Sequence, residues 1–463
     1  MIAKHYEMDM CRGPIGITLL KFILPLLLSN ALQRCFLLAD LVVIGQFADF
    51  RSLAAVGSVG HVTVLFIDLF IGIAIGTGVV AAHSYGAGDR RRFARTVQTS
   101  VVAAWWAGVA LMVLGMALTH PILKLLNTPD EIFCRAVSYQ MIILVGIPAQ
   151  LLTTVGCALL GSVGDTRRPL VIMTVSGVLN VVLNLVLVAV FRMDVVGVAV
   201  ATVLSEAVSV LLLYRLMRDP GEICHFRFRK SGFDWAIFRE TQKIGVPAGA
   251  QGICFAVSNL AIQTAVNGFG SVAIAGNTAA ASLEGFLYVA LAAFASATVS
   301  FVAQNYGGGQ YHRIRSGIRW CCIGCIVTGV LFCGAFLAAG PRLMAFFNPD
   351  PAVIEWGMMR FRVVCMAYVL CGLMDVSGAG LRGFGYSLTP ALSALVGTCV
   401  FRLWWVWEIF PRWRSLDGLL FSYPISWVLT GSFNFALLFF VSRKLFRAKV
   451  RKRHVVIARR AGA

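Results

Sequence analysis

The sequence predicts an all-α polytopic membrane protein: twelve transmembrane helices in two parallel six-helix repeats, an N-lobe and a C-lobe, around a central cleft. Hydrophobic residues make up 59% of the 463 residues and charged residues only 13%, which leaves too little polar surface to cover a soluble fold. Apolar stretches of the ~20 residues needed to cross a bilayer recur along the chain. In addition, the second half of the chain repeats the first.

The apolar stretches follow one another from near the N-terminus with polar loops between them. They run roughly over residues 16–46, 53–83, 96–119, 134–161, 168–191, 196–217, 236–265, 272–303, 316–340, 353–381, 388–411 and 417–442. The first is not expected to be a cleaved signal, because it is too long and charged residues precede it. We therefore expect twelve spans, the first of which remains in the protein.

The net charge of +19 follows the membrane topology. Most Lys and Arg residues lie at the N-terminus, in the loops after even-numbered spans and in the tail, with dense runs at residues 90–95, 227–230 and 443–460. Loops rich in Lys and Arg remain on the cytoplasmic side of a membrane, so we expect a multi-pass protein of the plasma membrane with both termini cytoplasmic. The basic tail can touch anionic membrane lipid. No basic face is separable from this topology, so no nucleic acid is expected as a partner.

Short motifs recur in the second half at an almost constant offset. YGAG at residues 85–88 recurs as YGGG at 306–309, and GDTRRP at 164–169 recurs as GYSLTP at 385–390, both 221 positions later. Six spans per half give parallel repeats, an arrangement suited to alternating access. We expect an N-lobe at residues 1–217, a cytoplasmic linker at 218–241, a C-lobe at 242–442 and a basic tail at 443–463.

With these motifs, the chain resembles the multidrug and toxic compound extrusion (MATE) transporters over nearly its whole length. The motifs that support the resemblance are Pro25 and Asp40 at P-x14-D spacing, LAAVG at residues 53–57, the twin YGxG loops, GDTRRP at 164–169 and LRG at 381–383. The resemblance implies an export protein that uses an inward H⁺ or Na⁺ gradient to expel amphipathic, often cationic, organic compounds. It implies no enzymatic activity and no cofactor, and we expect a monomer.

Four polar residues are candidates for ion coupling. Asp40 in span 1, Asn184 in span 5 and Thr202 in span 6 share a depth, and Asn180 lies one turn from Asn184 on the same face. A carboxylate inside a spanning helix costs about 2.5–3.5 kcal/mol, which points to function. The four side chains offer oxygens for Na⁺ or a hydrogen-bonded cage for a proton. The alternatives are an interfacial or packed Asp40, and asparagines that join helices.

The resemblance carries the family's coupling network onto these same four residues. Position 184 is often Asp in the family and is Asn here, which favours protons over Na⁺. The second repeat offers Asn259 or Ile262 opposite Asp40, and Phe401 and Trp405 opposite the two asparagines, so coupling is expected in the first lobe. The resemblance also implies that span 1 bends at Pro25 when the acid is protonated; a static kink is the alternative.

Other intramembrane residues are candidates for the network or for substrate contact. For each of the acids, a functional role and a structural pairing with another residue are both open. These acids are Asp68, Glu206, Glu284 and Asp375. The flat or adaptable side chains that could line a cleft, or face lipid instead, are Met141, Phe255, Phe286 and Tyr288.

The leading hypothesis is a multidrug antiporter, and two other classes compete with it. A flippase for lipid-linked intermediates would need a cationic cleft; the acids argue against it, while Arg34 and Arg402 leave it open. A membrane-embedded enzyme would need a nucleophile and a base at one depth, and His61 has no evident partner in the sequence.

Overall fold

A computed structural model describes residues 6–125, 129–226 and 232–461 of the chain. Within these ranges the regular structure is entirely helical, and twelve helical segments are long and apolar enough to cross a membrane, as the sequence predicts. The basic run at residues 227–230 and the last two residues of the tail lie outside the described residues, as do the side chains of Leu53, Ala54 and His61.

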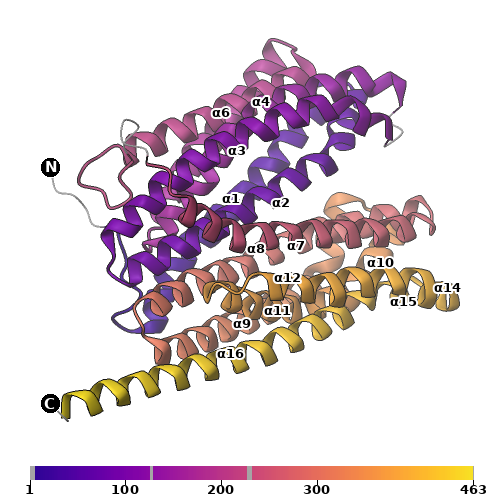
Figure 1. The fold of residues 1–463 in the computed structure, drawn as a ribbon. Helices are drawn as coiled ribbons and strands as arrows, with labels where there is room; N and C mark the ends of the chain where they lie inside the picture. The colour runs from indigo at the N-terminus through magenta and orange to yellow at the C-terminus, as the bar shows by residue number, and fades with distance from the viewer. Residues whose placement is uncertain (1–5, 126–128, 227–231, 462–463) are drawn as a thin grey trace. The chain divides into compact units, whose positions relative to one another are not determined.

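The helices cluster into two compact units, which apart from the indigo residues 11–19 run from indigo to rose and from salmon to yellow in Figure 1. The N-terminal unit comprises Met1–Met10 and Leu20–Ala256, and the C-terminal unit comprises Cys11–Leu19 and Val257–Ala463. The first and seventh spans therefore each contribute residues to both units. The division into two lobes and a linker at residues 217 and 242 stays a prediction.

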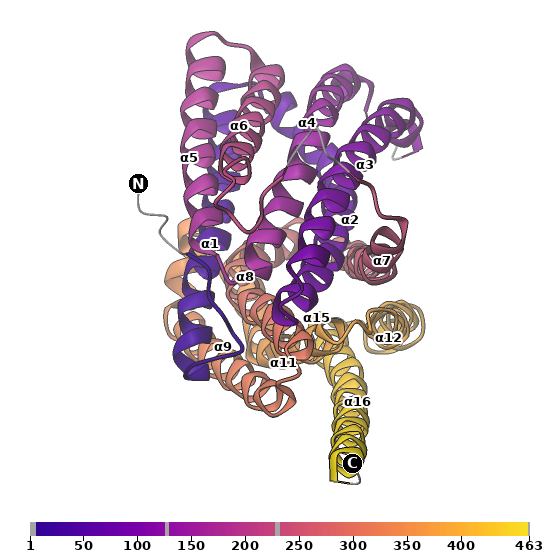
Figure 2. The same ribbon diagram turned by 60° about the vertical axis from the view of Figure 1, so that its left-hand side comes forward.

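The N-terminal unit contains the first span from Leu20 onward, spans 2 to 6 and the seventh span as far as Ala256. Its elements are α1 (Ile15–Phe47), α2 (Phe50–Gly86), α3 (Arg90–Leu125), α4 (Asp130–Ser162), α5 (Arg167–Asn184), η1 (Leu185–Val190), α6 (Asp194–Met217) and α7 (Trp235–Asn267). Helix α4 packs against α2, α3 and α6, and buried residues such as Leu144, Leu151 and Leu159 form its share of the core. Figure 2 shows α5 and α6 together beside α1.

The C-terminal unit holds spans 8 to 12, together with the beginning of α1 and the end of α7 from Val257 onward. Its elements are α8 (Ser271–Gly307), α9 (Tyr311–Phe347), α10 (Pro351–Arg360), η3 (Phe361–Cys365), α11 (Met366–Gly383), α12 (Leu388–Ala394), η4 (Leu395–Val400), α13 (Phe401–Trp404), η5 (Trp405–Ile409), α14 (Phe410–Trp413), α15 (Leu416–Leu420) and α16 (Ser422–Ala461). Helix α11 packs against α8, α9 and α16, which parallels the central place of α4 in the first unit.

Corresponding glycines in the turns of the two repeats have similar φ angles. Gly88 and Gly309 have φ angles of 72° and 66°, and Gly164 and Gly385 have φ angles of 87° and 90°. Both pairs are 221 positions apart, and only glycine adopts such angles without strain. The duplication predicted from the sequence is therefore confirmed in the local geometry of its loops.

A glycine contact joins α2 to the beginning of α7 within the N-terminal unit. A Cβ atom on Gly72 would lie 2.3 Å from the backbone nitrogen of Gly249, and one on Gly76 would lie 2.2 Å from the carbonyl oxygen of Thr241. Small residues let helix backbones approach closely in a membrane, where van der Waals packing replaces the hydrophobic effect. This contact explains why the first part of the seventh span packs as part of the N-terminal unit.

Candidate functional site

The centre of the candidate site is a hydrogen bond between spans 1 and 5. Asn184 Nδ2 donates to Asp40 Oδ1 over 2.5 Å. Asn184 is fully buried, and Asp40 is partly buried. A hydrogen bond to an ionised carboxylate is about twice as strong as one between neutral groups. The pair therefore links α1 to the end of α5 at the level of the carboxylate.

The hydrogen bonds continue from this pair to span 6. Asn184 Nδ2 also donates to Asn180 Oδ1 over 3.2 Å, and Asn180 Nδ2 donates to Thr202 Oγ1 over 3.4 Å. The Thr202 hydroxyl donates to the carbonyl oxygen of Val198 in its own helix over 3.0 Å. The structure thus brings together all four residues that the sequence groups, three of them by depth and Asn180 by its helix face.

The depths of these residues follow from their positions in the helices. Asp40 lies seven residues before the end of α1, Asn184 lies six before the end of η1 and Thr202 lies eight after the start of α6. At 1.5 Å per residue these separations are roughly 9–12 Å. The network is therefore at one level in the outer half of the predicted topology.

One buried atom of the network has no partner. Among the described residues no group hydrogen-bonds to Asn184 Oδ1. The nitrogen of the same carboxamide, by contrast, donates two hydrogen bonds, one to Asp40 and one to Asn180. A buried polar atom without a partner costs about 1–3 kcal/mol. This oxygen, beside a carboxylate, is the feature of the network that can accept a proton donor or a cation.

The outer side of the network is closed by apolar packing and by ion pairs. Val43, Ile44, Val188 and Val198 form a buried cluster from α1, η1 and α6. Beyond it, Arg135 Nη1 lies 3.2 Å from Asp49 Oδ2 and Arg135 Nε lies 3.4 Å from Asp194 Oδ2. The hydrogen bond from Arg135 lowers the pKa of Asp49, an exposed residue between α1 and α2.

The donor set of the network suits a small hard cation or a proton. Asp40, Asn180, Asn184 and Thr202 offer a carboxylate, two carboxamide oxygens and a hydroxyl, which are ligands that Na⁺ accepts. Three of these four groups already accept a hydrogen bond. No cluster of three or more His, Cys, Asp or Glu side chains with metal-binding geometry occurs in the part of the chain that the structure describes.

Glu206 lies near the network on α6 but contacts α4. Its carboxyl group hydrogen-bonds to Thr153, and its Oε2 has no partner among the described residues. The Thr153 hydroxyl donates to the carbonyl oxygen of Ala149 over 3.1 Å, so its proton is already used. The contact therefore joins α6 to α4 and lies apart from the hydrogen bonds of Asp40, Asn180, Asn184 and Thr202.

The other three acids have different environments. Glu284 Oε2 receives hydrogen bonds from Arg360 Nε at 2.9 Å and Arg360 Nη2 at 2.8 Å, so Glu284 forms a buried ion pair. Asp375 interacts electrostatically with Arg382 in its own helix. Asp68 packs beside Gly252 of α7, where an added Cβ would lie 2.9 Å from the Asp68 Cβ.

The four residues predicted to line a cleft lie on three helices. Met141 is on α4, Phe255 on α7, and Phe286 and Tyr288 are on α8, with Tyr288 the most exposed of them. Pro25 lies inside α1, which is one continuous helix. Whether these residues contact substrate, and whether α1 bends, stay predictions.

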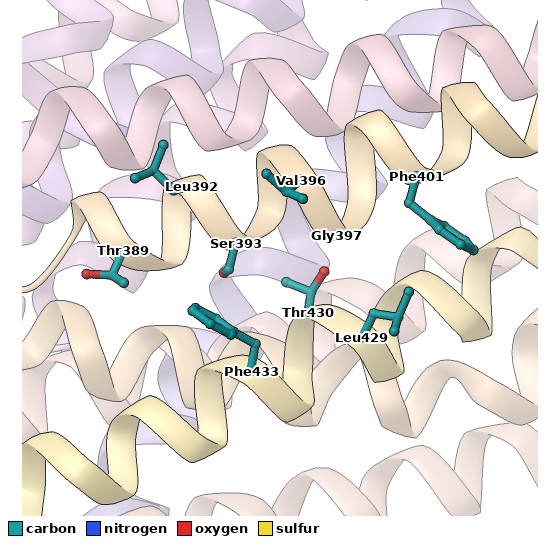
Figure 3. A pocket seen from close by; sticks show the side chains of 9 residues that line it. All are labelled: Thr389, Leu392, Ser393, Val396, Gly397, Phe401, Leu429, Thr430 and Phe433. Carbon is teal, nitrogen blue, oxygen red and sulfur yellow. The ribbon is translucent and has the colours of Figure 1, made fainter.

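A separate apolar groove runs along the eleventh and twelfth spans (Figure 3). It has a volume of about 560 Å³ and lies between α12, η4 and α13 on one side and α16 on the other. Its lining residues are Thr389, Leu392, Ser393, Val396, Gly397, Phe401, Leu429, Thr430 and Phe433. None of the four predicted cleft residues lines this groove.

Sequence reasoning named Glu284 and Arg402 separately, but it missed Arg360 and the polar cluster that these residues form in the C-terminal unit. It includes Arg360, the partner of Glu284, and Arg402, whose guanidinium lies 4.3 Å from the centre of the Tyr423 ring. The signal in the sequence was the presence of arginines inside spans 10 and 11.

Comparisons with known proteins agree with this architecture. A family model described as MatE matches residues 25–186 and 247–406, one match in each repeat. A Bacillus subtilis protein named "Probable multidrug resistance protein YoeA" is 26% identical over 397 residues, which is 83% of this chain and 84% of that protein. A Shewanella oneidensis protein named "FAD transporter" is 26% identical over 429 residues, 90% of this chain and 93% of that protein.

Solved structures show the same fold. A crystal structure of MATE in complex with MaL6 has a TM-score of 0.89 at 19% sequence identity and covers 96% of this chain and 100% of its own chain. At this identity the likeness concerns the fold alone.

Proposed function

This chain belongs to the MatE family, and from that premise we propose that it is a secondary antiporter that exports amphipathic organic compounds in exchange for H⁺. The observation that carries the proposal is the Asp40–Asn184 hydrogen bond beside the unpartnered Asn184 Oδ1. A transporter needs a group whose partners change when it binds the ion, and this pair has two alternative hydrogen-bonding arrangements.

In the first arrangement Asp40 is ionised and accepts an N–H group of Asn184. When a proton binds, the carboxyl group becomes a donor, and its best nearby acceptor is the Asn184 carboxamide oxygen. Rotation of the carboxamide would break the hydrogen bond to Asn180 Oδ1, which uses the same Nδ2 atom. Protonation of Asp40 would therefore replace the present hydrogen bond between α1 and α5 by one of opposite direction, and would break the Asn184–Asn180 hydrogen bond within α5.

We propose that this exchange of hydrogen bonds allows α1 to move relative to α5. Pro25 lies fifteen residues before Asp40 in the same helix and removes one backbone hydrogen bond there. We propose that this point absorbs the change in helix direction during alternating access. Na⁺ is the second candidate ion, bound by the oxygens of Asp40, Asn180, Asn184 and Thr202.

The substrate follows from family membership in general terms only. Relatives are named multidrug resistance proteins, and one is named an FAD transporter, so we propose an amphipathic organic compound without fixing its charge. We propose that the protein works as a monomer in the cell membrane with both termini in the cytoplasm, needs no cofactor and is not an enzyme.

The test is dye efflux from proteoliposomes under an imposed pH gradient and, separately, an imposed Na⁺ gradient. Wild-type protein should export a dye under the pH gradient, and Asp40→Asn should not, although it folds. Export by Asp40→Asn at the wild-type rate would contradict coupling at Asp40. Export under the Na⁺ gradient alone would replace H⁺ by Na⁺ in the proposal.

A further inference from the structure

Arg402 is a buried cation near the middle of the eleventh span. Its residue is 1% exposed, and it lies fourteen residues after the start of the span at Leu388 and eleven before its end at Trp413. At 1.5 Å per residue these distances are roughly 21 and 17 Å. An arginine keeps its charge in a protein, so a full positive charge lies deep in the C-terminal unit.

The partners of this charge are neutral. Arg402 Nε donates to Ser426 Oγ over 3.0 Å and Nη1 donates to Asn259 Oδ1 over 2.9 Å. The guanidinium also lies over the rings of Tyr423 at 4.3 Å and Trp427 at 6.0 Å. Within the described ranges no carboxylate forms an ion pair with Arg402.

A neighbouring arginine, Arg360, does have a charged partner. Arg360 also lies near the Tyr423 ring, 5.4 Å from its centre, and its charge is balanced by Glu284. Glu284 therefore compensates Arg360 and leaves Arg402 without a counter-charge. A buried charge without one is strongly unfavourable, and in membrane spans such residues mark binding sites or ion pathways.

The position of Arg402 matches that of the coupling network in the first repeat. Asn180 and Asn184 in span 5 link Asp40 in span 1 to Thr202 in span 6. Arg402 in span 11 likewise links Asn259 in span 7 to Ser426 in span 12. The two repeats thus place polar clusters on corresponding spans, with a carboxylate in the first and a guanidinium in the second.

The correspondence between Asn180 and Arg402 is not found with a constant repeat offset of 221 positions, because that offset places Phe401 opposite Asn180. The π-helical segment η4, Leu395–Val400, precedes Arg402, whereas η1, Leu185–Val190, follows Asn184. A π-helical turn accommodates one extra residue in the helix. The register is therefore shifted by one at this point, and Arg402 takes the inward position.

The guanidinium lies close to an exposed side chain. Asn259, which accepts the hydrogen bond from Nη1, is exposed. A carboxylate or phosphate that displaced the Asn259 carboxamide would exchange a neutral acceptor for a charged one, and guanidinium binds such groups in a fork of two hydrogen bonds.

We propose that Arg402 binds an anionic group, a carboxylate or a phosphate, of the compound that this transporter exports. The inference rests on the proposed function, and it gives that function a substrate class: anionic or zwitterionic amphipathic compounds. The aromatic rings of Tyr423 and Trp427 hold the guanidinium in place, and the Asn259 carboxamide occupies the site until a substrate replaces it.

The first experiment measures equilibrium binding with purified full-length protein in a neutral detergent at pH 7.5. The probes are carboxyfluorescein, which is anionic, and ethidium, which is cationic, followed by fluorescence polarisation. Arg402→Gln should weaken carboxyfluorescein binding by about tenfold or more, since a charge-assisted bidentate contact is lost, and should leave ethidium binding unchanged. Equal loss of both probes, or unchanged carboxyfluorescein binding, would overturn the proposal.

A second variant guards against misfolding of Arg402→Gln. Asn259→Asp is close to isosteric and changes an exposed residue, but it places a carboxylate against the guanidinium. It should fold normally and weaken carboxyfluorescein binding to a similar extent, because the new carboxylate at position 259 would pair with the Arg402 guanidinium and compensate its charge. The matched control is Arg412→Gln, which removes an exposed charge that pairs with Glu408 in the same span and should change neither probe.

Two transport measurements separate the inference from the proposed function and identify the source of the anion. Dye export in phosphatidylcholine proteoliposomes tests antiport: if no gradient moves either dye while Arg402-dependent binding persists, the antiport proposal fails and the anion site stands. Flipping of a fluorescently labelled phosphatidylglycerol, measured by dithionite quenching, tests a lipid source. Flipping that Arg402→Gln abolishes would assign the site to a lipid headgroup, and flipping that is absent would assign it to soluble anions.

Discussion

The carboxamide nitrogen of Asn184 lies 2.5 Å from the carboxylate of Asp40, while the carboxamide oxygen of Asn184 has no hydrogen-bond partner among the described residues. The Asn184 nitrogen therefore provides a donor for an ionised Asp40, and the Asn184 oxygen is an acceptor that a protonated Asp40 could use. Proton exchange at this pair is the basis of the first two predictions.

Asp40→Asn should reduce pH-driven export at least a hundredfold, because an asparagine cannot exchange a proton. The measurement is dye efflux from proteoliposomes over pH 5.5–8. Asp49→Asn is the matched control, since Asp49 also lies at the outer end of α1. Its pKa is lowered by the hydrogen bond from Arg135, so it stays ionised throughout this range. A changed pH profile in Asp49→Asn would contradict this assignment.

Asn184→Asp should change the ion preference. It places a second carboxylate beside Asp40, and two negative charges at hydrogen-bonding distance favour a bound cation or a shared proton. We expect the variant to gain export driven by a Na⁺ gradient that the wild type lacks. The same rate under Na⁺ in both proteins would show that residue 184 does not select the ion. Asn180→Asp, one turn away, tests whether the effect requires direct contact with Asp40.

Gly76→Leu should lower the apparent melting temperature of the purified protein by several degrees or prevent its folding. A Cβ at this position would lie 2.2 Å from the Thr241 carbonyl oxygen, so α2 and α7 would have to separate. Gly57→Ala is the control on the same helix, because nothing lies within 4 Å of its added Cβ. Equal melting temperatures for Gly76→Leu and wild type would contradict the close packing of these helices.

Glu284→Gln should destabilise the C-terminal unit by about 3–5 kcal/mol, since it leaves Arg360 as an uncompensated buried charge. The double variant with Arg360→Met should be more stable than the single variant, because it removes both charges. The measurement is thermal unfolding in detergent, read by circular dichroism. If the double variant were the less stable, the two residues would contribute independently and the ion pair would not explain their burial.

The sequence alone determined the fold, the duplication and the grouping of the first site. Hydropathy along the chain reports how many helices cross the bilayer, and a repeat offset of 221 reports which spans correspond. Asp40, Asn184 and Thr202 could be grouped because topology fixes the depth of a residue from its distance to the helix end. Asn180 could be added because residues four apart share a helix face.

The tertiary structure decided which way the side chains of the second repeat face. Arg402 was assigned no partner from the sequence, because the π-helical segment η4 shifts its register by one residue, a change that hydropathy does not record. The pairing of Glu284 with Arg360 joins residues 76 positions apart, on α8 and α10. Such contacts depend on how each helix is rotated against its neighbours, and that rotation is set by the packing of whole helices rather than by the residues of any one of them.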